Sequence, residues 1–222
     1  MNDLGNSISK AFTFNAYDIP FALVYFCSAV SGISGLLADD TGLERRSASD
    51  SSNYSEFGNT DRTRLIYTLK STVGVPEGHL LAPLVVEIQL GQVRTGNIDL
   101  STINHVWPFM RMATEQTEIN VNLPAESLEG FRYQGWPDIP SSAVAVPIFG
   151  AREMNGKDLM TGMLIMGINP RRTFDEDYLS WIRLCSRHIA AAMNLTQSVE
   201  EAAQKAEELA TLNRNRTAFF NR

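Results

Sequence analysis

Residues that could do chemistry are few in this sequence and lie far apart. The three histidines are His79, His105 and His188, and no two of them have the four-residue spacing with which a pair of histidines on one helix binds zinc. Gly32 and Gly35 belong to the segment SGISGLL, which lacks the lysine of a phosphate-binding loop. The sequence therefore predicts no catalytic residues and no metal site.

The two cysteines and an acidic triplet have structural explanations. Cys27 and Cys185 stand in apolar surroundings, so we expect buried free thiols in a reducing compartment, with a disulfide between them as the alternative. The run Asp175-Glu176-Asp177 precedes a long helical pattern, where each carboxylate stabilises the start of a helix by about 0.3–1 kcal/mol. We therefore interpret these acids as helix-start residues and not as a metal site.

Composition narrows the class of protein. The net charge is −6 and the pI is about 5.1, and no cluster of Lys and Arg stands out, which argues against a nucleic-acid partner. No apolar run approaches the ~18 residues of a membrane-spanning helix, and residues 1–10 lack the features of a signal peptide. We therefore expect a cytoplasmic protein without membrane contact.

A long helix is predicted for residues 174–220, which contain no Gly or Pro. Within it, one set of residues recurs at alternating spacings of three and four, a period typical of a helix that pairs with another helix along a narrow stripe. We call this stripe the seam; it consists of Cys185, His188, Ala192, Leu195, Val199, Ala202, Ala206, Leu209 and Asn213. Alanine at three of these positions predicts a weak coiled coil in a homodimer. The alternative, a helix packed on its own domain, fits residues 174–195 better than 196–220.

The rest of the chain alternates between helix and strand patterns. Residues 4–17 and 104–117 carry helical apolar faces, and residues 20–30 have the composition of a strand buried on both faces. Residues 31–61, rich in Ser, Gly, Asp and Asn, predict a disordered insertion. Because the later strands follow one another closely, we expect an α+β fold with an antiparallel sheet of about six strands and helices on one face. Further strands are predicted at 63–73, 84–90, 118–123, 141–149 and 158–168.

Several segments together resemble a known family. They are DIPFALVY, GVPEGH, SSAVAVPI, MLIMGINPRRTFDEDY and ELATLNRNRTAFF. This series is similar to the GAF sensor domain of hybrid two-component histidine kinases, in which a segment like LNRNRTAFF leads into the kinase dimerisation helix. The resemblance implies a GAF domain at 4–195 and a coiled-coil signalling helix at 196–222. The given sequence ends at Arg222, ahead of a phospho-accepting histidine, so we expect no enzymatic activity from it, although its parent resembles a histidine kinase.

The resemblance also implies a ligand pocket on the uncovered face of the sheet. The side chains that would line it, with Arg111 and Arg132 as anion contacts, are Tyr67, Trp107, Met110, Arg111, Phe131, Arg132, Tyr133 and Trp136. The alternative is that the aromatic rings fill the core. GAF domains that carry a bilin attach it to a cysteine near this pocket. We place Cys27 in an outer strand and Cys185 in the last helix, so no covalent bilin or metal is expected, and the cofactor stays unknown.

These observations leave three candidate functions for the chain. The first is a sensor, in which a small molecule bound to the GAF domain changes the dimer and the signal passes through the seam residues from His188 to Leu209. The second is a dimerisation module without a ligand, which only positions the kinase helices. The third is an enzyme like the methionine-sulfoxide reductases that share the GAF fold, but these need clustered cysteines that this sequence lacks.

Overall fold

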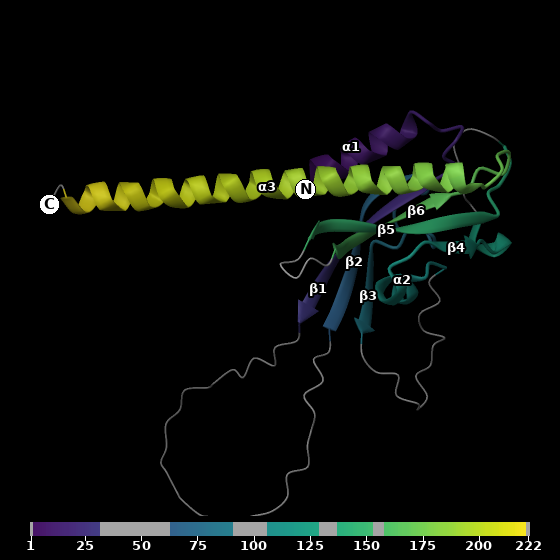
Figure 1. Cartoon of the computed structure of the whole chain (residues 1–222), viewed down its shortest axis with the longest axis horizontal. Coiled ribbons are helices and arrows are strands. Elements are labelled where there is room, and N and C mark those ends of the chain that lie inside the picture. Colours follow the sequence, from purple (N-terminus) through teal and green to yellow (C-terminus); the bar gives the residue numbers. More distant parts are fainter. Residues whose placement is uncertain (1, 32–62, 91–105, 129–136, 153–157, 221–222) are drawn as a thin grey trace, which may run out of the picture.

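The structure is a computed structural model of the whole chain (Figure 1). The predicted disordered insertion at 31–61 lies, apart from residue 31, outside the residues that it describes. The described parts of the chain are residues 2–31, 63–90, 106–128, 137–152 and 158–220.

A six-stranded antiparallel sheet forms the centre of the molecule (Figure 1). Its strand order is β3-β2-β1-β6-β5-β4, so the first and last strands of the chain pair in the middle, with Ala22 opposite Met166. The prediction of an α+β fold with about six antiparallel strands is confirmed. The strands are β1 (Ala22–Ser31), β2 (Thr63–Val73), β3 (Val85–Leu90), β4 (Ile119–Asn122), β5 (Ser142–Arg152) and β6 (Asp158–Gly167).

Strand β1 is buried on both faces, as its composition predicts. Leu23 and Tyr25 belong to the core cluster on one face of the sheet, whereas Ala22 and Val24 belong to the cluster on the other, and all four are at most 1 % exposed. The prediction that Cys27 lies in an outer strand is wrong, because β1 has a hydrogen-bonded neighbour on each side. Strand order depends on pairing between distant segments, which the pattern of a single strand does not encode.

Helices lie on both faces of the sheet, so the prediction of helices on one face is also wrong. Helices α1 (Asn2–Thr13) and α3 (Glu176–Phe220) cover the same face. Helix α2 (Phe109–Glu115) buries Met112 in the cluster on the opposite face, where the 3-10 turn η2 (Ala125–Leu128) also packs. The long helix that links the sheet to the C-terminus is therefore separated from α2 by the full thickness of the sheet.

Hydrogen bonds hold the start of α3 against the sheet. The carboxylate of Asp175 accepts a hydrogen bond from the backbone N–H of Tyr178 at 2.9 Å, which is a helix cap and confirms its interpretation as a helix-start residue. The buried Tyr178 hydroxyl donates to the carbonyl of Asp18 at 3.2 Å and accepts from the backbone N–H of Asn169 at 3.3 Å. These bonds join α3 to the segments before β1 and after β6. Burial raises the pKa of Tyr178, so it stays a neutral donor.

Candidate functional site on helices α1 and α3

Helix α3 has two halves with different surroundings (Figure 1). Its first half packs on the sheet through Ile182, Ile189 and Met193, all at most 5 % exposed. Its second half extends beyond the sheet, and every side chain described from 197 to 212 is exposed. This division matches the expectation that only residues 174–195 have the broad apolar face of a packed helix.

The seam stays exposed along the second half. Leu195, Val199 and Leu209 are 67 %, 60 % and 61 % exposed, and Ala202 and Ala206 between them are exposed as well. Within the sheet-packed half, His188 is exposed and Ala192 is half-buried. The side chain of Asn213, the last seam position, is not among those that the structure describes. Large aliphatic side chains in a row on a projecting helix keep most of their surface in water, and a second helix packed along the seam would bury that surface.

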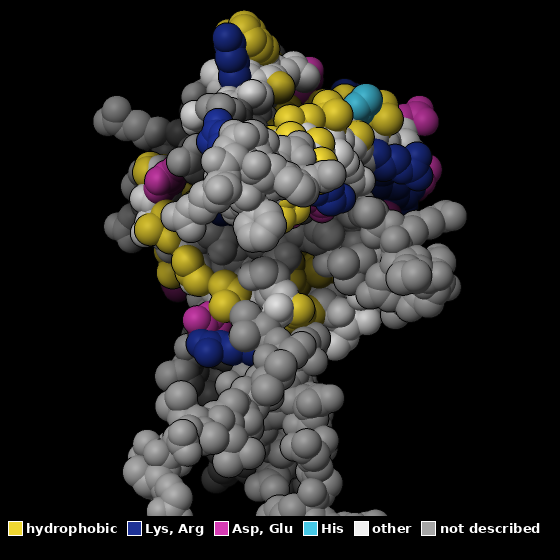
Figure 2. All heavy atoms as spheres, turned by 90° about the vertical axis from the view of Figure 1, so that its left-hand side faces the viewer, with side chains coloured by type: hydrophobic (Ala, Val, Ile, Leu, Met, Phe, Trp, Pro, Cys, Tyr) yellow, Lys and Arg dark blue, Asp and Glu magenta, His cyan; other side chains and the backbone are white. Residues whose placement is uncertain are grey.

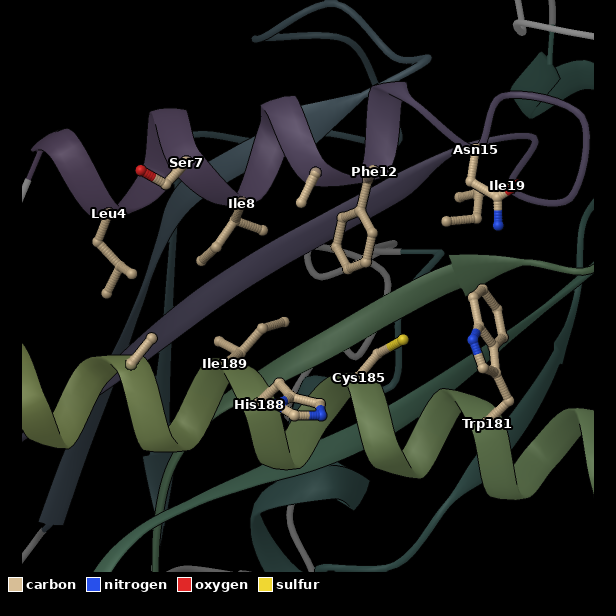
Figure 3. Close-up of a pocket in the computed structure, with 12 residues that line it drawn as sticks. Leu4, Ser7, Ile8, Phe12, Asn15, Ile19, Trp181, Cys185, His188 and Ile189 are labelled. Atoms are coloured by element: carbon tan, nitrogen blue, oxygen red, sulfur yellow. The ribbon is translucent and has the colours of Figure 1, made fainter.

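A groove separates α1 from the first half of α3 (Figure 3). It has a volume of about 410 Å³. Phe12 and Ile8 reach into it from α1, and Trp181 and Ile189 approach from α3 (Figure 3). Neither helix alone would make this hollow, because its walls come from opposite ends of the chain. The sequence analysis predicted both helices but not the groove.

The groove is largely apolar and leads into the seam. Its few polar or polarisable groups include the side chains of Ser7, Asn15, Cys185 and His188. The last two, with Ala192, are the first three seam positions, so the groove and the exposed stripe of α3 form one continuous surface. Seen from the C-terminal end of α3, hydrophobic side chains gather beside a histidine on this part of the molecule (Figure 2). We call the groove and the seam together the α1/α3 surface.

Two polar contacts set the position of α3 beneath this surface. The Ser186 hydroxyl is buried and donates a hydrogen bond to the carbonyl of Pro147 in β5 at 2.6 Å. The Arg183 guanidinium donates to Glu118, just before β4, at 2.6 Å, and this bond lowers the pKa of the Glu118 carboxyl. Both contacts lie on the sheet side of α3, so they hold the helix without using its seam.

Tyr67 and Trp107, both predicted to line a ligand pocket, lie together in the core on the opposite face. They are 0 % and 2 % exposed. The Trp107 indole N–H donates a hydrogen bond to the carbonyl of Leu81 at 2.6 Å, and the Tyr67 ring lies 5.0 Å from that of Phe109. In the described residues these two aromatic side chains fill the core, which was the alternative interpretation.

The other predicted pocket residues fall into two groups. Two of them lie on the surface of α2 and not in the core with Tyr67 and Trp107, and four lie outside the described residues. Met110 is 44 % exposed on α2, and Arg111 is exposed and pairs with Glu115 one helical turn away at 2.8 Å. Phe131, Arg132, Tyr133 and Trp136 lie outside the described residues. The pocket as a whole therefore stays a prediction.

Cys27 lies on the face of the sheet where the pocket was predicted. It stands directly across from Tyr67 in the β1–β2 pairing and packs against the same core cluster. The Tyr67 hydroxyl is buried and has no well-aligned hydrogen bond within the described residues, although the Cys27 thiol lies beside it. Burial raises the pKa of both groups. The expectation that excluded a bilin because Cys27 is remote thus rested on a wrong strand position.

Within the described residues, no group of three or more His, Cys, Asp or Glu side chains could hold a metal ion in a single copy. None of the helices described is both long and apolar enough to cross a membrane. The chain matches no protein-family model, and a search of curated proteins also gave no match.

Proposed function

We propose that this chain is the sensor module of a two-component histidine kinase, in which a GAF-like domain forms a homodimer through the α1/α3 surface and signals through α3. The observation that carries the proposal is the exposed seam. Leu195, Val199 and Leu209 stand in water at the spacing of a coiled coil. A parallel copy of the same helix buries all of them at once.

The geometry of α3 suits the transfer of a signal. Its first half is joined to the sheet by the bonds of Tyr178 and Ser186, so that half moves with the domain. Residues 196–220 project about 37 Å, at a rise of about 1.5 Å per residue. Alanine at Ala192, Ala202 and Ala206 keeps the seam weak, so a modest change in the domain pair can shift the coiled coil between two arrangements.

The kinase connection rests on the end of α3. The segment LNRNRTAFF at 212–220 resembles the sequence that leads into the dimerisation helix of hybrid histidine kinases. In such a kinase two parallel helices must leave the sensor side by side, and α3 carries its seam in that direction.

A second candidate function is a dimerisation module that binds no ligand and only sets the spacing of the kinase helices. The packing of Tyr67 and Trp107 favours it, because these side chains fill core space that the first candidate leaves for a small molecule. The two candidates share the dimer and differ in whether the domain retains a ligand.

Mass spectrometry of the purified 222-residue chain under native and denaturing conditions tests both candidates. A dimer is expected under native conditions. A mass excess larger than that of a single metal ion, present in the native dimer and lost on denaturation, supports the sensor, whereas a dimer without such an excess supports the module without a ligand. A monomer at all protein concentrations would overturn the proposal in both forms.

A further inference from the structure

Cys185 and His188 occupy the first two positions of the seam and both line the groove (Figure 3). They are three residues apart on one helix, so their Cα atoms are offset by about 4.5 Å along its axis and their side chains share a face. His188 is exposed and makes no hydrogen bond or ion pair with the described residues, and Cys185 is a half-buried free thiol. The sequence analysis overlooked this pair because it compared spacings only among the three histidines and treated Cys185 as a buried thiol.

Among the described residues, a single copy offers two ligands at this place, which is too few for a stable metal site. A parallel homodimer doubles the number of ligands that can meet at one place. Residues at the same seam position face each other across the two-fold axis, so two Cys185 thiols and two His188 imidazoles meet in adjacent layers. The next layer is Ala192, whose small side chain lets the two helices approach closely there.

We propose that the homodimer binds one Zn²⁺ ion between its two α3 helices, held by Cys185 and His188 of each copy. The inference rests on the dimer of the proposed function. Two thiolates and two imidazoles are a preferred tetrahedral ligand set for zinc, with Zn–S distances of about 2.3 Å and Zn–N distances of about 2.0–2.1 Å. Each Cys185 gives its thiol proton to solvent, and each His188 binds through a neutral ring nitrogen.

Charge and surroundings agree with this ligand set. Zn²⁺ with two thiolates and two neutral imidazoles has no net charge, so the filled site can lie beside an apolar groove without an unpaired buried charge. Phe12, Trp181 and Ile189 supply that apolar wall. Zinc binding releases the two thiol protons, so it must weaken as the pH falls.

The site would make the strength of dimerisation depend on zinc. The zinc ion would join the two α3 helices at the end of the seam nearest the sheet, where the coiled coil begins. The layers from Leu195 onward would keep their weak packing. Because zinc binds the dimer and not the monomer, it tightens the dimer by mass action.

The experiment uses the full 222-residue chain, stripped with a chelator and then titrated with ZnCl₂. Bound zinc is counted by elemental analysis after gel filtration, and the dimer dissociation constant is measured by sedimentation equilibrium with and without zinc. Co²⁺ replaces Zn²⁺ in a parallel titration, because tetrahedral Co²⁺ with thiolate ligands has a characteristic visible spectrum. The variants are Cys185→Ser and His188→Ala, with Cys27→Ser as the matched control, since it removes the other thiol on the far face of the sheet.

The expected result is one zinc per two chains, a dimer at least roughly tenfold tighter with zinc, and the tetrahedral cobalt spectrum. Cys185→Ser and His188→Ala lose all three, whereas Cys27→Ser keeps them. A dimer that retains no zinc would overturn the metal site and leave the proposed function intact. Zinc bound at one per chain, or equally by the Cys185→Ser variant, would also overturn the shared site. A monomer with and without zinc would overturn both proposals.

Discussion

Replacing Leu195 by alanine tests the dimer at its first large aliphatic layer. The substitution removes three carbon atoms, each worth about 0.8 kcal/mol when buried. Leu195 is 67 % exposed in one copy, so about two thirds of that value, roughly 1.6 kcal/mol, can be gained only in the dimer. Two copies of the residue meet at the seam, so the dimer loses about 3 kcal/mol, which is roughly a 200-fold rise in its dissociation constant.

Sedimentation equilibrium over a range of protein concentrations measures this constant directly. Leu80→Ala is the matched control, because Leu80 is 61 % exposed but lies off α3 and away from the seam. Thermal unfolding of the monomer should be the same for both variants, since neither side chain belongs to the buried core. If Leu195→Ala and Leu80→Ala change the dissociation constant equally, the seam is not the interface and the reasoning from exposure and spacing fails.

Three further predictions concern the domain itself and are measured by urea unfolding at pH 7 unless stated. Tyr178→Phe leaves two buried backbone groups without their partner and should lower the free energy of unfolding by about 1–3 kcal/mol; no change would mean that this link to α3 is solvent-mediated. Trp107→Phe leaves the buried carbonyl of Leu81 without its hydrogen-bond donor and opens space in the core, so the free energy of unfolding should fall by about 2–4 kcal/mol. If Trp107 instead lined an open ligand pocket, the same substitution would change the free energy of unfolding little. Glu118 has a lowered pKa through its hydrogen bond from Arg183, so its contribution, about 1 kcal/mol or less, is present above the ordinary carboxyl pKa and is lost as the pH falls through the lowered value. Glu118→Gln should therefore be less stable than wild type at neutral pH and equally stable at low pH; a constant difference contradicts the assignment.

The elements with a strong local period were predictable from the sequence. The spacing in residues 174–220 gave a long helix, and α3 spans Glu176–Phe220. The run of branched and aromatic residues at 20–30 predicted a strand buried on both faces, and β1 is such a strand. Gly74 and Gly78, between β2 and β3, have positive φ values of 76° and 79°, a backbone conformation that favours glycine. In each case neighbouring residues carry the information, because helix and strand periods are properties of a few consecutive turns or pleats.

Features that depend on contacts between distant segments were beyond the sequence analysis. The middle position of β1 and the contact between Asn169 and Tyr178 both follow from pairing across many residues. The sequence by itself determined the seam and its exposure beyond residue 195, because the spacing of apolar residues along the chain is enough to define a stripe of period 3.5. Only the tertiary structure decided that the stripe begins in a groove beside α1, because that groove needs two helices from opposite ends of the chain to pack on one face of the sheet.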